Sequence, residues 1–372
     1  MIYDFGVIGG GIAGVSTAYE LAENGSVLLL ETENAMGYHA TGRSAALFTR
    51  NFGGPVVRRV NDASVGFFVQ PPSGFCDSPL LSARGCLTVA SAGFEDELEP
   101  LIAMSKAGQE VCRIDPKEAL ERVPFLRPKR VQGAVYEANV SDIDVASLHQ
   151  GYIKGARARG AEMLVKQGVT RISRDAGAWL IETANTSFRA LQIVNAAGAW
   201  ADEIGALVGA CSIGLVPKRR TGILIKAPNE IDCAKLPAID FAGTDAYMKP
   251  DAGRLMVSPG DATPSAPMDA WADNMDIAVL ADWIESETHI KVSKVEHSWA
   301  GLRSFVPDEA PVVGFDPDVP DFFWLAGQGG YGIMMAPVLA KLTADLCTKS
   351  KSEITMQFAE TLSPARLNSA AK

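Results

Sequence analysis

The sequence lacks any long apolar run and any excess of positive charge. No stretch approaches the ~18 apolar residues that a membrane-spanning helix requires. The 34 lysines and arginines are outnumbered by 44 acidic residues, which gives a net charge of -10. Because nucleic acids are held mainly by basic residues that neutralise phosphates, DNA and RNA are not expected partners. The first residues also lack the basic cluster of a signal peptide, so we expect a cytoplasmic protein, with peripheral membrane contact left open.

Metal-binding and disulfide patterns are absent as well. The six cysteines are scattered without a CxxC pair, and the four histidines share no ligand spacing. Such a pattern is typical of reduced thiols rather than of a disulfide framework or a zinc site. No internal repeat is present, and 47% of the residues are hydrophobic. This composition is that of an ordinary globular enzyme, and no metal is expected.

The length and the opening pattern indicate a two-domain protein that begins with a βαβ unit. A chain of 372 residues exceeds the usual size of a single core. Apolar patterning predicts a buried strand from Tyr3 to Ile8, a helix from Ile12 to Glu23 and a second buried strand from Ser26 to Leu30.

Later segments predict further strands and two helices. Asp144 has the position of a helix cap. Residues 169–173, 179–183 and 188–194 alternate with turn residues and predict a three-stranded meander. The region from Arg219 to about His297 is rich in strand patterns, with one helix near Asp276 to Glu287.

A glycine motif lies between the first predicted strand and the first predicted helix. Gly9, Gly11 and Gly14 form GxGxxG, and Glu31 ends the next strand. In this arrangement Gly9 allows a tight turn, Gly11 lets the backbone approach a pyrophosphate at the helix N-terminus, and Gly14 allows close helix–strand packing. Glu31 can accept hydrogen bonds from ribose hydroxyls. The motif predicts dinucleotide binding, but it does not separate NAD from FAD.

Four further segments carry a family resemblance. They are Gly37-Tyr38-His39-Ala40-Thr41-Gly42-Arg43-Ser44-Ala45-Ala46, Asn195-Ala196-Ala197-Gly198-Ala199-Trp200, Trp299-Ala300-Gly301-Leu302-Arg303 and Ala326-Gly327-Gln328-Gly329-Gly330-Tyr331-Gly332. Together with the glycine motif they resemble the D-amino-acid oxidase superfamily, which includes glycine and sarcosine oxidases and bacterial D-amino-acid dehydrogenases. The resemblance runs from Ile2 to about Leu346 and looks closest to bacterial D-arginine dehydrogenase.

The resemblance implies the fold class and the domains. We expect an α/β protein with a Rossmann-like FAD-binding domain of the two-dinucleotide-binding flavoprotein type. The substrate domain should be α+β, built on a mixed, largely antiparallel sheet. We assign residues 1–80, 141–212 and 298–372 to the FAD-binding domain, and residues 81–140 and 213–297 to the substrate-binding domain.

The resemblance also implies which residues contact the cofactor. In this family the flavin is noncovalent or linked to a cysteine, and the residues from Ser304 to Asp308 contain no cysteine, so we expect noncovalent FAD. The expected cofactor-binding residues are Gly9, Gly11, Ile12, Ala13, Gly14, Glu31, Thr41, Gly42, Arg43, Ser44, Ala45, Ala46, Val169, Ala197, Gly198, Trp200, Arg303, Gly329, Gly330, Tyr331, Gly332 and Ile333.

Two arginines are candidates for binding a substrate carboxylate, since a guanidinium offers a bidentate and permanently charged partner. Arg303 lies in the Trp-Ala-Gly-Leu-Arg segment. Arg220 opens a strand of the second domain, although its neighbour Arg219 could serve instead. Tyr247 matches the family tyrosine that joins the carboxylate site, and Gly330 completes this set.

The substrate side-chain pocket is where the chain departs from the resemblance. By position, the polar pocket residues of D-arginine dehydrogenase become Leu47, Phe52, Cys86 and Met334 here. A guanidinium buried without its carboxylate partner costs about 3–5 kcal/mol, which makes D-arginine a doubtful substrate. Apolar lining instead favours a neutral or hydrophobic side chain.

The expected function is FAD-dependent oxidative deamination of a D-amino acid, by a dehydrogenase or an oxidase. Hydride transfer from Cα to flavin N5 would give an imino acid, which water hydrolyses to the 2-oxo acid and ammonia. No side-chain base is assigned, and His39 is set aside because it precedes the FAD-contacting loop. The alternatives are oxidation of a secondary amine of the glycine/sarcosine type, oxidation of a 2-hydroxy acid, or a flavin-binding assembly factor without turnover. The sequence does not identify the electron acceptor, which can be a quinone, a dye or O2.

Overall fold

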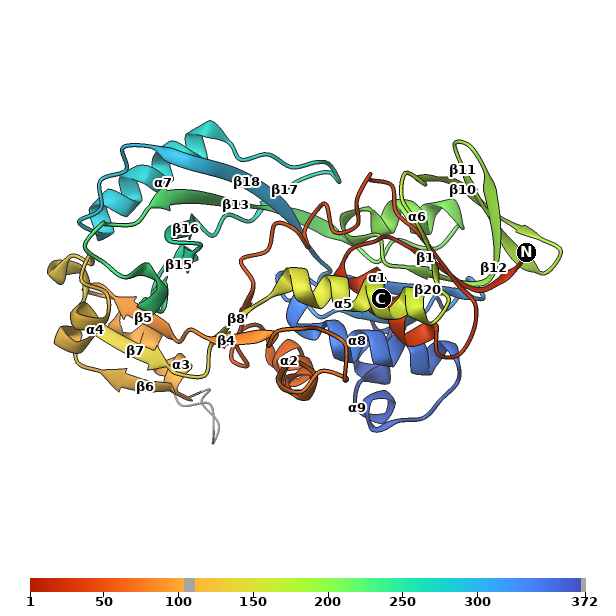
Figure 1. Cartoon of the computed structure of the whole chain (residues 1–372), viewed down its shortest axis with the longest axis horizontal. Coiled ribbons are helices and arrows are strands. Elements are labelled where there is room, and N and C mark those ends of the chain that lie inside the picture. Colours follow the sequence, from red (N-terminus) through yellow and green to blue (C-terminus); the bar gives the residue numbers. More distant parts are fainter. Residues whose placement is uncertain (104–110, 369–372) are drawn as a thin grey trace.

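The computed structural model describes residues 1–103 and 111–368 and contains two large β-sheets, one of eight and one of nine strands. Figure 1 shows the two sheets toward opposite ends of the long axis. The long strands β13 (Val216–Lys226) and β18 (Val295–Phe305) run side by side from one end toward the other. Within the described residues, no helix combines the length and the apolar character needed to cross a membrane.

The eight-stranded sheet is built around parallel strands. Strand β1 (Tyr3–Ile8) pairs in parallel with β2 (Val27–Leu30) on one side and with β12 (Ser187–Asn195) on the other. Nearly all residues of β1 and β2 are buried, as expected for parallel strands that are covered on both faces. The remaining strands are β9 (Glu162–Leu164), β10 (Val169–Asp175), β11 (Ala178–Thr183), β19 (Val312–Phe315) and β20 (Phe322–Ala326).

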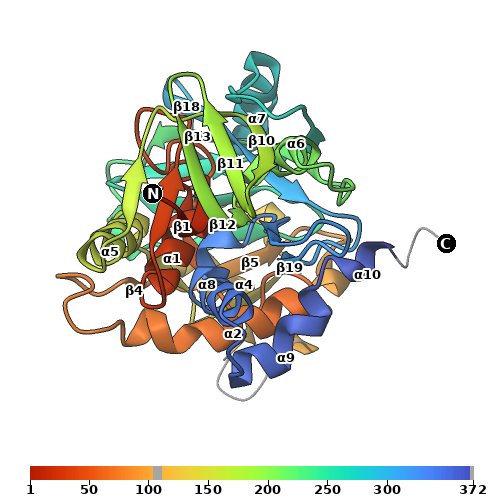
Figure 2. The ribbon, with the colours of Figure 1, turned by 90° about the vertical axis from the view of Figure 1, so that its right-hand side faces the viewer.

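Helix α1 (Ile12–Leu21) follows β1 directly and packs against α5 (Val145–Ala158) and α8 (Gly332–Cys347). The apolar faces of these helices share one buried cluster, which fixes the N-terminus of α1 relative to the sheet. Figure 2 shows α1, α8 and α2 below strands β1 and β12. The other helices of this part are α2 (Pro55–Val69), α6 (Ala201–Leu207), α9 (Glu353–Leu362), α10 (Ala365–Asn368) and the 3-10 turn η3 (Gly198–Trp200).

The nine-stranded sheet is mixed and largely antiparallel, with the order β17-β13-β16-β15-β14-β5-β7-β6 and β18 paired to β13. Only the β14–β5 pair is parallel among these neighbours. Its strands include β5 (Cys86–Ala90), β6 (Val111–Ile114), β7 (Gly133–Glu137), β14 (Ala238–Phe241), β15 (Tyr247–Asp251), β16 (Arg254–Ser258) and β17 (Thr263–Pro264).

The two faces of this sheet differ. One face carries Leu87, Ile239 and Met248, which pack against α7 (Asn274–Glu287) in a buried apolar cluster. Because side chains alternate along a strand, their neighbours Cys86, Asp240 and Tyr247 lie on the opposite face. The remaining elements are α3 (Leu98–Ala103), α4 (Pro116–Arg122), the turns η1 (Glu95–Glu97), η2 (Pro128–Arg130) and η4 (Cys233–Lys235), and a small sheet of β3 (Leu47–Phe48), β4 (Leu81–Ala83) and β8 (Ser141–Ile143).

The predicted fold class is confirmed, and several predicted elements form as expected. The meander is antiparallel β10-β11-β12. Asp144 caps α5 by accepting a hydrogen bond from the Ser147 N–H at 2.8 Å. The predicted domain boundary at residue 298 falls inside β18, because this long strand pairs with β13 along its whole length.

Candidate functional site

A cavity of about 490 Å³ is lined by residues from both sheets. The β1–α1 turn, the segment 37–44 and the segment 325–333 form one wall, and strands β13, β15, β16 and β18 contribute the other. We call these the cofactor wall and the substrate wall, after the expectations drawn from the sequence.

The cofactor wall is built mainly from backbone. Gly9 has φ of 110°, and a Cβ there would overlap the carbonyl oxygen of Ala196. A Cβ at Gly14 would overlap the carbonyl oxygen of Gly9. Only glycines therefore let the helix begin this close to the strand. Gly11, Ile12 and Ala13 line the cavity, so the positive end of α1 faces it.

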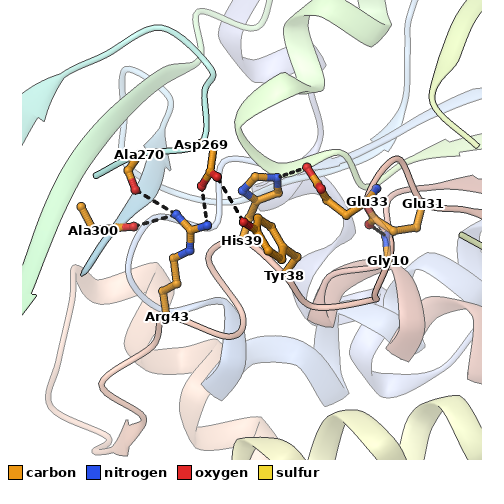
Figure 3. A network of polar contacts seen from close by, with 9 residues as sticks. All are labelled: Gly10, Glu31, Glu33, Tyr38, His39, Arg43, Asp269, Ala270 and Ala300. Atoms are coloured by element: carbon orange, nitrogen blue, oxygen red, sulfur yellow. Dashed lines mark hydrogen bonds and ion pairs between the residues drawn. The ribbon is translucent and has the colours of Figure 1, made fainter. Parts of the chain in front are cut away.

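Glu31 stabilises the same turn with both of its carboxylate oxygens. One oxygen accepts the N–H of Gly10 at 2.6 Å, and the other accepts the N–H of Glu33 at 2.8 Å. Figure 3 shows Glu31 beside Gly10 at the edge of this network. A helix N-terminus for a pyrophosphate and an acidic side chain for a ribose are the parts that a dinucleotide requires, so this wall fits FAD.

Arg43 ties the segment 37–44 to the substrate domain. Its guanidinium donates to the carbonyl oxygens of Ala270 at 3.0 Å and Ala300 at 2.9 Å, and it forms a 2.5 Å ion pair with Asp269 (Figure 3). The Arg43 side chain holds the pKa of Asp269 below its usual range. Thr41, in the same segment, contacts the start of α1: its hydroxyl oxygen accepts a hydrogen bond from the Ile12 N–H at 2.9 Å.

His39 lines the cofactor wall and pairs with Glu33. Its Nε2 atom lies 2.9 Å from a Glu33 carboxylate oxygen, and its ring lies 4.7 Å from that of Trp200 between centroids. Figure 3 shows His39 directed toward Glu33. The histidine is thus positioned by the cofactor wall itself.

The substrate wall brings together the three predicted carboxylate-binding residues. Arg220, Tyr247 and Arg303 all line the cavity, and Arg303 donates a 3.3 Å hydrogen bond to the Tyr247 hydroxyl. Antiparallel pairing sets Arg220 opposite Gly301 and Lys218 opposite Arg303, so Arg220 and Arg303 share one face. Arg219 points elsewhere and pairs with Asp276 at 2.5 Å. Of these two arginines, Arg220 is therefore the candidate for binding a substrate carboxylate.

The electrostatics of this wall favour an anion. Burial, together with the nearby positive charge of Arg303, lowers the pKa of Arg220. The Arg220 Nε atom is buried and has no hydrogen-bond partner within the described residues. A buried donor without a partner is costly, and a carboxylate would satisfy it. Burial also raises the pKa of Tyr331, which feels the charges of both arginines.

Most of the predicted cofactor-binding residues line the cavity, but some do not. Gly14 acts through helix–strand packing instead, and Tyr331 packs against Phe52 at 5.1 Å between ring centroids. The predicted residues outside the lining are Gly14, Gly42, Ala45, Ala46 and Tyr331.

None of the four predicted pocket residues Leu47, Phe52, Cys86 and Met334 is part of the lining. Met334 is 3% exposed and belongs to the apolar core of α8, because the helix turns this position toward α1 and α2. Phe52 is 48% exposed. Leu47 and Cys86 pack together in a small cluster on the open face of the nine-stranded sheet. The expected apolar pocket is therefore not formed as predicted.

Several lining residues were missed. Trp299 lies in the same segment as Arg303, so the motif contained a signal for it. Met256 and Met268 come from the second domain and carry no recognisable pattern. The missed polar and aromatic members are Thr32, Glu33, Tyr38, His39, Gln167, Glu203, Thr221, Trp299, Ser304 and Gln328.

Comparison with known proteins gives a consistent picture. The family described as "DAO: FAD dependent oxidoreductase" matches residues 4–346. The mitochondrial dimethylglycine dehydrogenase of Homo sapiens is 27% identical over 366 residues, covering 91% of this chain and 42% of the relative. The glycine oxidase of Geobacillus kaustophilus (strain HTA426) is 24% identical over 371 residues, covering 94% of both. This chain thus spans about two fifths of the first relative and nearly all of the second.

Solved structures agree on the fold. The glycine oxidase from Geobacillus kaustophilus superimposes with a TM-score of 0.81 at 24% identity, over 94% of this chain and 96% of that one. The L-alpha-glycerophosphate oxidase from Mycoplasma pneumoniae with FAD bound gives 0.84 at 20% identity, over 95% and 97%. These findings support the superfamily expected from the sequence. They do not support the narrower resemblance to D-arginine dehydrogenase.

Proposed function

This chain belongs to the family of FAD-dependent oxidoreductases, and from that premise we propose that it oxidises the Cα–N bond of an amino acid or N-alkylated amino acid. One observation carries the proposal: Arg220 and Arg303 converge on one cavity, and the buried Arg220 Nε atom has no hydrogen-bond partner in the part of the chain that the structure describes. Two guanidinium groups in a half-buried wall repel each other unless an anion lies between them. A substrate carboxylate supplies that anion with a matching bidentate geometry.

Within this class we favour a secondary amine over the D-amino acid first expected from the sequence. The relatives include a dimethylglycine dehydrogenase and glycine oxidases, and a sarcosine dehydrogenase of Homo sapiens is 25% identical. All of these names refer to small amino acids or their N-methyl forms. A primary D-amino acid remains the second candidate, because the carboxylate anchor accepts either.

The residues of the chain would act by binding and positioning. Bound FAD would accept the hydride that leaves Cα. Arg220 and Arg303 hold the carboxylate, and Tyr247 orients Arg303 through its hydroxyl. The substrate nitrogen loses one proton to solvent, its lone pair forms the C=N bond, and water then hydrolyses the imine to a 2-oxo acid and an amine. Positioning and exclusion of water are the contributions that this wall makes.

Anaerobic mixing of the FAD-bound enzyme with matched amines tests the proposal. The panel contains glycine, N-methylglycine, N,N-dimethylglycine, both isomers of alanine, the decarboxylated counterpart of each, and lactate as a 2-hydroxy acid. We expect at least one carboxylate-bearing amine to bleach the flavin absorbance about 100-fold or more efficiently than its decarboxylated counterpart does. Bleaching only by a 2-hydroxy acid would assign the site to that alternative, and no bleaching by any compound would favour a protein without turnover.

A further inference from the structure

Strand β18, which carries Arg303, is attached to the cofactor wall at two points. At one point the Gly329 N–H donates a hydrogen bond to the carbonyl oxygen of Ser304 at 2.9 Å. At the other point, residues 299–301 of the strand contact Arg43 in the segment 37–44. Arg303 lies between the two attachments, so they set its place relative to the cofactor wall.

The attachment at Arg43 is made in both directions. The Trp299 indole Nε1–H donates to the carbonyl oxygen of Arg43 at 3.2 Å. In return, the Arg43 guanidinium donates to the carbonyl oxygen of Ala300 at 2.9 Å (Figure 3). The main chain and the side chain of one residue are thus bonded to two consecutive residues of β18. We call these two hydrogen bonds the Arg43–Trp299 brace.

Two glycines give the brace its room. Gly222 on β13 is paired with Trp299, and a Cβ on Gly222 would lie 2.6 Å from the indole ring, which is too close. A Cβ on Gly301 would lie 3.4 Å from the Arg43 Cβ, so the main chain of β18 passes directly beside Arg43. Glycines inside strands are typical of such close approaches. The indole ring and the guanidinium therefore have little freedom to move.

Apolar packing at this boundary is slight. The buried cluster there consists of Ala199, Ala270, Ala300 and Leu302, and each of the two large sheets has a separate and larger core. Small side chains bury little apolar area, whereas hydrogen bonds are directional. The brace, rather than shared core packing, therefore fixes this part of β18 against the segment 37–44.

The position of β18 matters because Arg303 belongs to the carboxylate anchor. Gly301 and Arg303 lie on the same face of the strand, two residues or ~7 Å apart. A tilt of the strand about its bond to Gly329 would therefore move the anchor relative to the cofactor wall. Hydride transfer requires the reacting atoms to be about 3–3.5 Å apart, and a misplacement of ~1 Å can lower the rate about 100-fold.

We propose that Arg43 and Trp299 are positioning residues for flavin reduction: their brace holds β18 so that a substrate bound to Arg303 presents its Cα to the flavin. The proposal rests on the proposed function, because it takes Arg220 and Arg303 as the carboxylate anchor. The brace joins two sequence motifs that are 256 residues apart, one in each wall of the cavity. It thus gives the segment 37–44 a task beyond contact with the cofactor.

Two substitutions each remove one half of the brace. Trp299→Phe keeps an aromatic ring but loses the Nε1–H, and Arg43→Met loses the guanidinium. The limiting rate of anaerobic flavin reduction is measured with a saturating amount of the best amino acid of the panel. We expect this rate to fall about 10-fold in Trp299→Phe and about 100-fold in Arg43→Met, with flavin content unchanged.

Matched controls remove similar hydrogen bonds away from the cavity. The Trp179 indole on β11 donates to the carbonyl oxygen of Asp321 at the same distance, 3.2 Å, and Trp179 is outside the cavity lining. Arg127 donates twice to the carbonyl oxygen of Glu285, at 3.1 and 3.0 Å, and is also outside the lining. Trp179→Phe and Arg127→Met should keep the reduction rate of the unaltered enzyme. An equal fall in these controls would contradict a specific role of the brace.

Acetate tests the same displacement without turnover. It has the carboxylate of glycine but no amine, so it should bind to the anchor and change the absorbance of the nearby flavin. In Trp299→Phe and Arg43→Met we expect its dissociation constant to stay within about twofold of that of the unaltered enzyme. The amplitude of the absorbance change should nevertheless fall, because the anchor is intact but displaced from the flavin.

The double variant shows whether the two residues act as one unit. Residues that share one interaction have non-additive effects, so the double variant should reduce its flavin within about twofold of the rate of Arg43→Met. A combined fall of about 1000-fold, the product of the two single effects, would mean that Trp299 acts independently of Arg43 and would overturn the brace.

The outcomes separate the brace from the proposed function. Unchanged reduction rates in both single variants would overturn the brace and leave the carboxylate anchor standing. Loss of flavin from both variants would place the two residues in the cofactor site and would also overturn the positioning role. If acetate neither changed the flavin absorbance of the unaltered enzyme nor slowed its reduction by the amino acid, the anchor, and with it the proposed function, would be wrong.

Discussion

The two walls of the cavity recognise their ligands by different means. The cofactor wall uses backbone groups from a short contiguous stretch, Gly9 to Gly14, supported by Glu31. The substrate wall uses side chains from strands that are far apart in the chain, such as Arg220, Tyr247 and Arg303. A backbone site tolerates almost no added atom, whereas a side-chain site changes its ligand with single substitutions. The predictions below probe this difference.

The largest expected effect is at Gly14. In Gly14→Ala the new methyl group would overlap the carbonyl oxygen of Gly9, so the β1–α1 turn must shift away from its ligand-binding position. Overpacking of this kind costs about 1–3 kcal/mol, and we expect the purified variant to lose its flavin. Gly66→Ala on α2 is the matched control, because a Cβ there meets nothing within 4 Å. Normal flavin content in Gly14→Ala would contradict the backbone account.

A smaller effect is expected at His149, which contacts the backbone of the β1–α1 turn in the cofactor wall. Its Nε2 atom lies 3.1 Å from the carbonyl oxygen of Gly10, and burial lowers its pKa. Below about pH 6.5 the unfolded chain binds a proton at this residue that the folded chain does not bind. The free energy of unfolding should therefore decrease as the pH is lowered through that range. His149→Gln should cost ~1 kcal/mol at about pH 8 and should flatten this pH dependence.

Chemical unfolding of the flavin-bound protein at about pH 8 and about pH 5.5 measures the effect at His149. His289→Gln is the control, since His289 is exposed and should leave the slope unchanged. If the free energy of unfolding of His149→Gln depended on pH as strongly as that of the unaltered protein, other titrating groups would be responsible for the loss of stability at low pH.

An effect no larger than that at His149 is expected on the substrate wall at Tyr247. Tyr247→Phe removes the 3.3 Å hydrogen bond to Arg303 and leaves the arginine in place. A loss of ~1 kcal/mol corresponds to about a fivefold rise in KM for the amino acid, with flavin content unchanged. Steady-state kinetics would measure it, with Tyr136→Phe on the opposite face of the sheet as the control. A loss of flavin would mean that Tyr247 serves the cofactor wall as well.

The sequence predicts the β1–α1 turn of the cofactor wall well because the parts of this turn are local. The strand Tyr3–Ile8, the helix that begins at Ile12 and the glycines between them are neighbours in the chain, so their geometry follows from the pattern. The same holds for Asp144, whose cap depends only on the next three residues.

The substrate wall could be predicted only in part, because strand register decides which side chains meet. Arg219 and Arg220 are equivalent in the sequence, and only the pairing of β13 with β18 turns Arg220 toward the cavity. Leu47, Phe52, Cys86 and Met334, in place of polar residues, predicted an apolar pocket. None of the four lines the cavity.

The most direct test of the central claim is whether Arg220 recognises the substrate carboxylate. Anaerobic flavin reduction would be measured for the enzyme and for Arg220→Met, with the best amino acid of the panel and with its decarboxylated counterpart. Arg219→Met serves as the control, since Arg219 pairs with Asp276. The account predicts a loss of about 100-fold or more in efficiency for the amino acid in Arg220→Met, and little change for the decarboxylated amine. An equal loss for both compounds, or no loss for the amino acid, would contradict it.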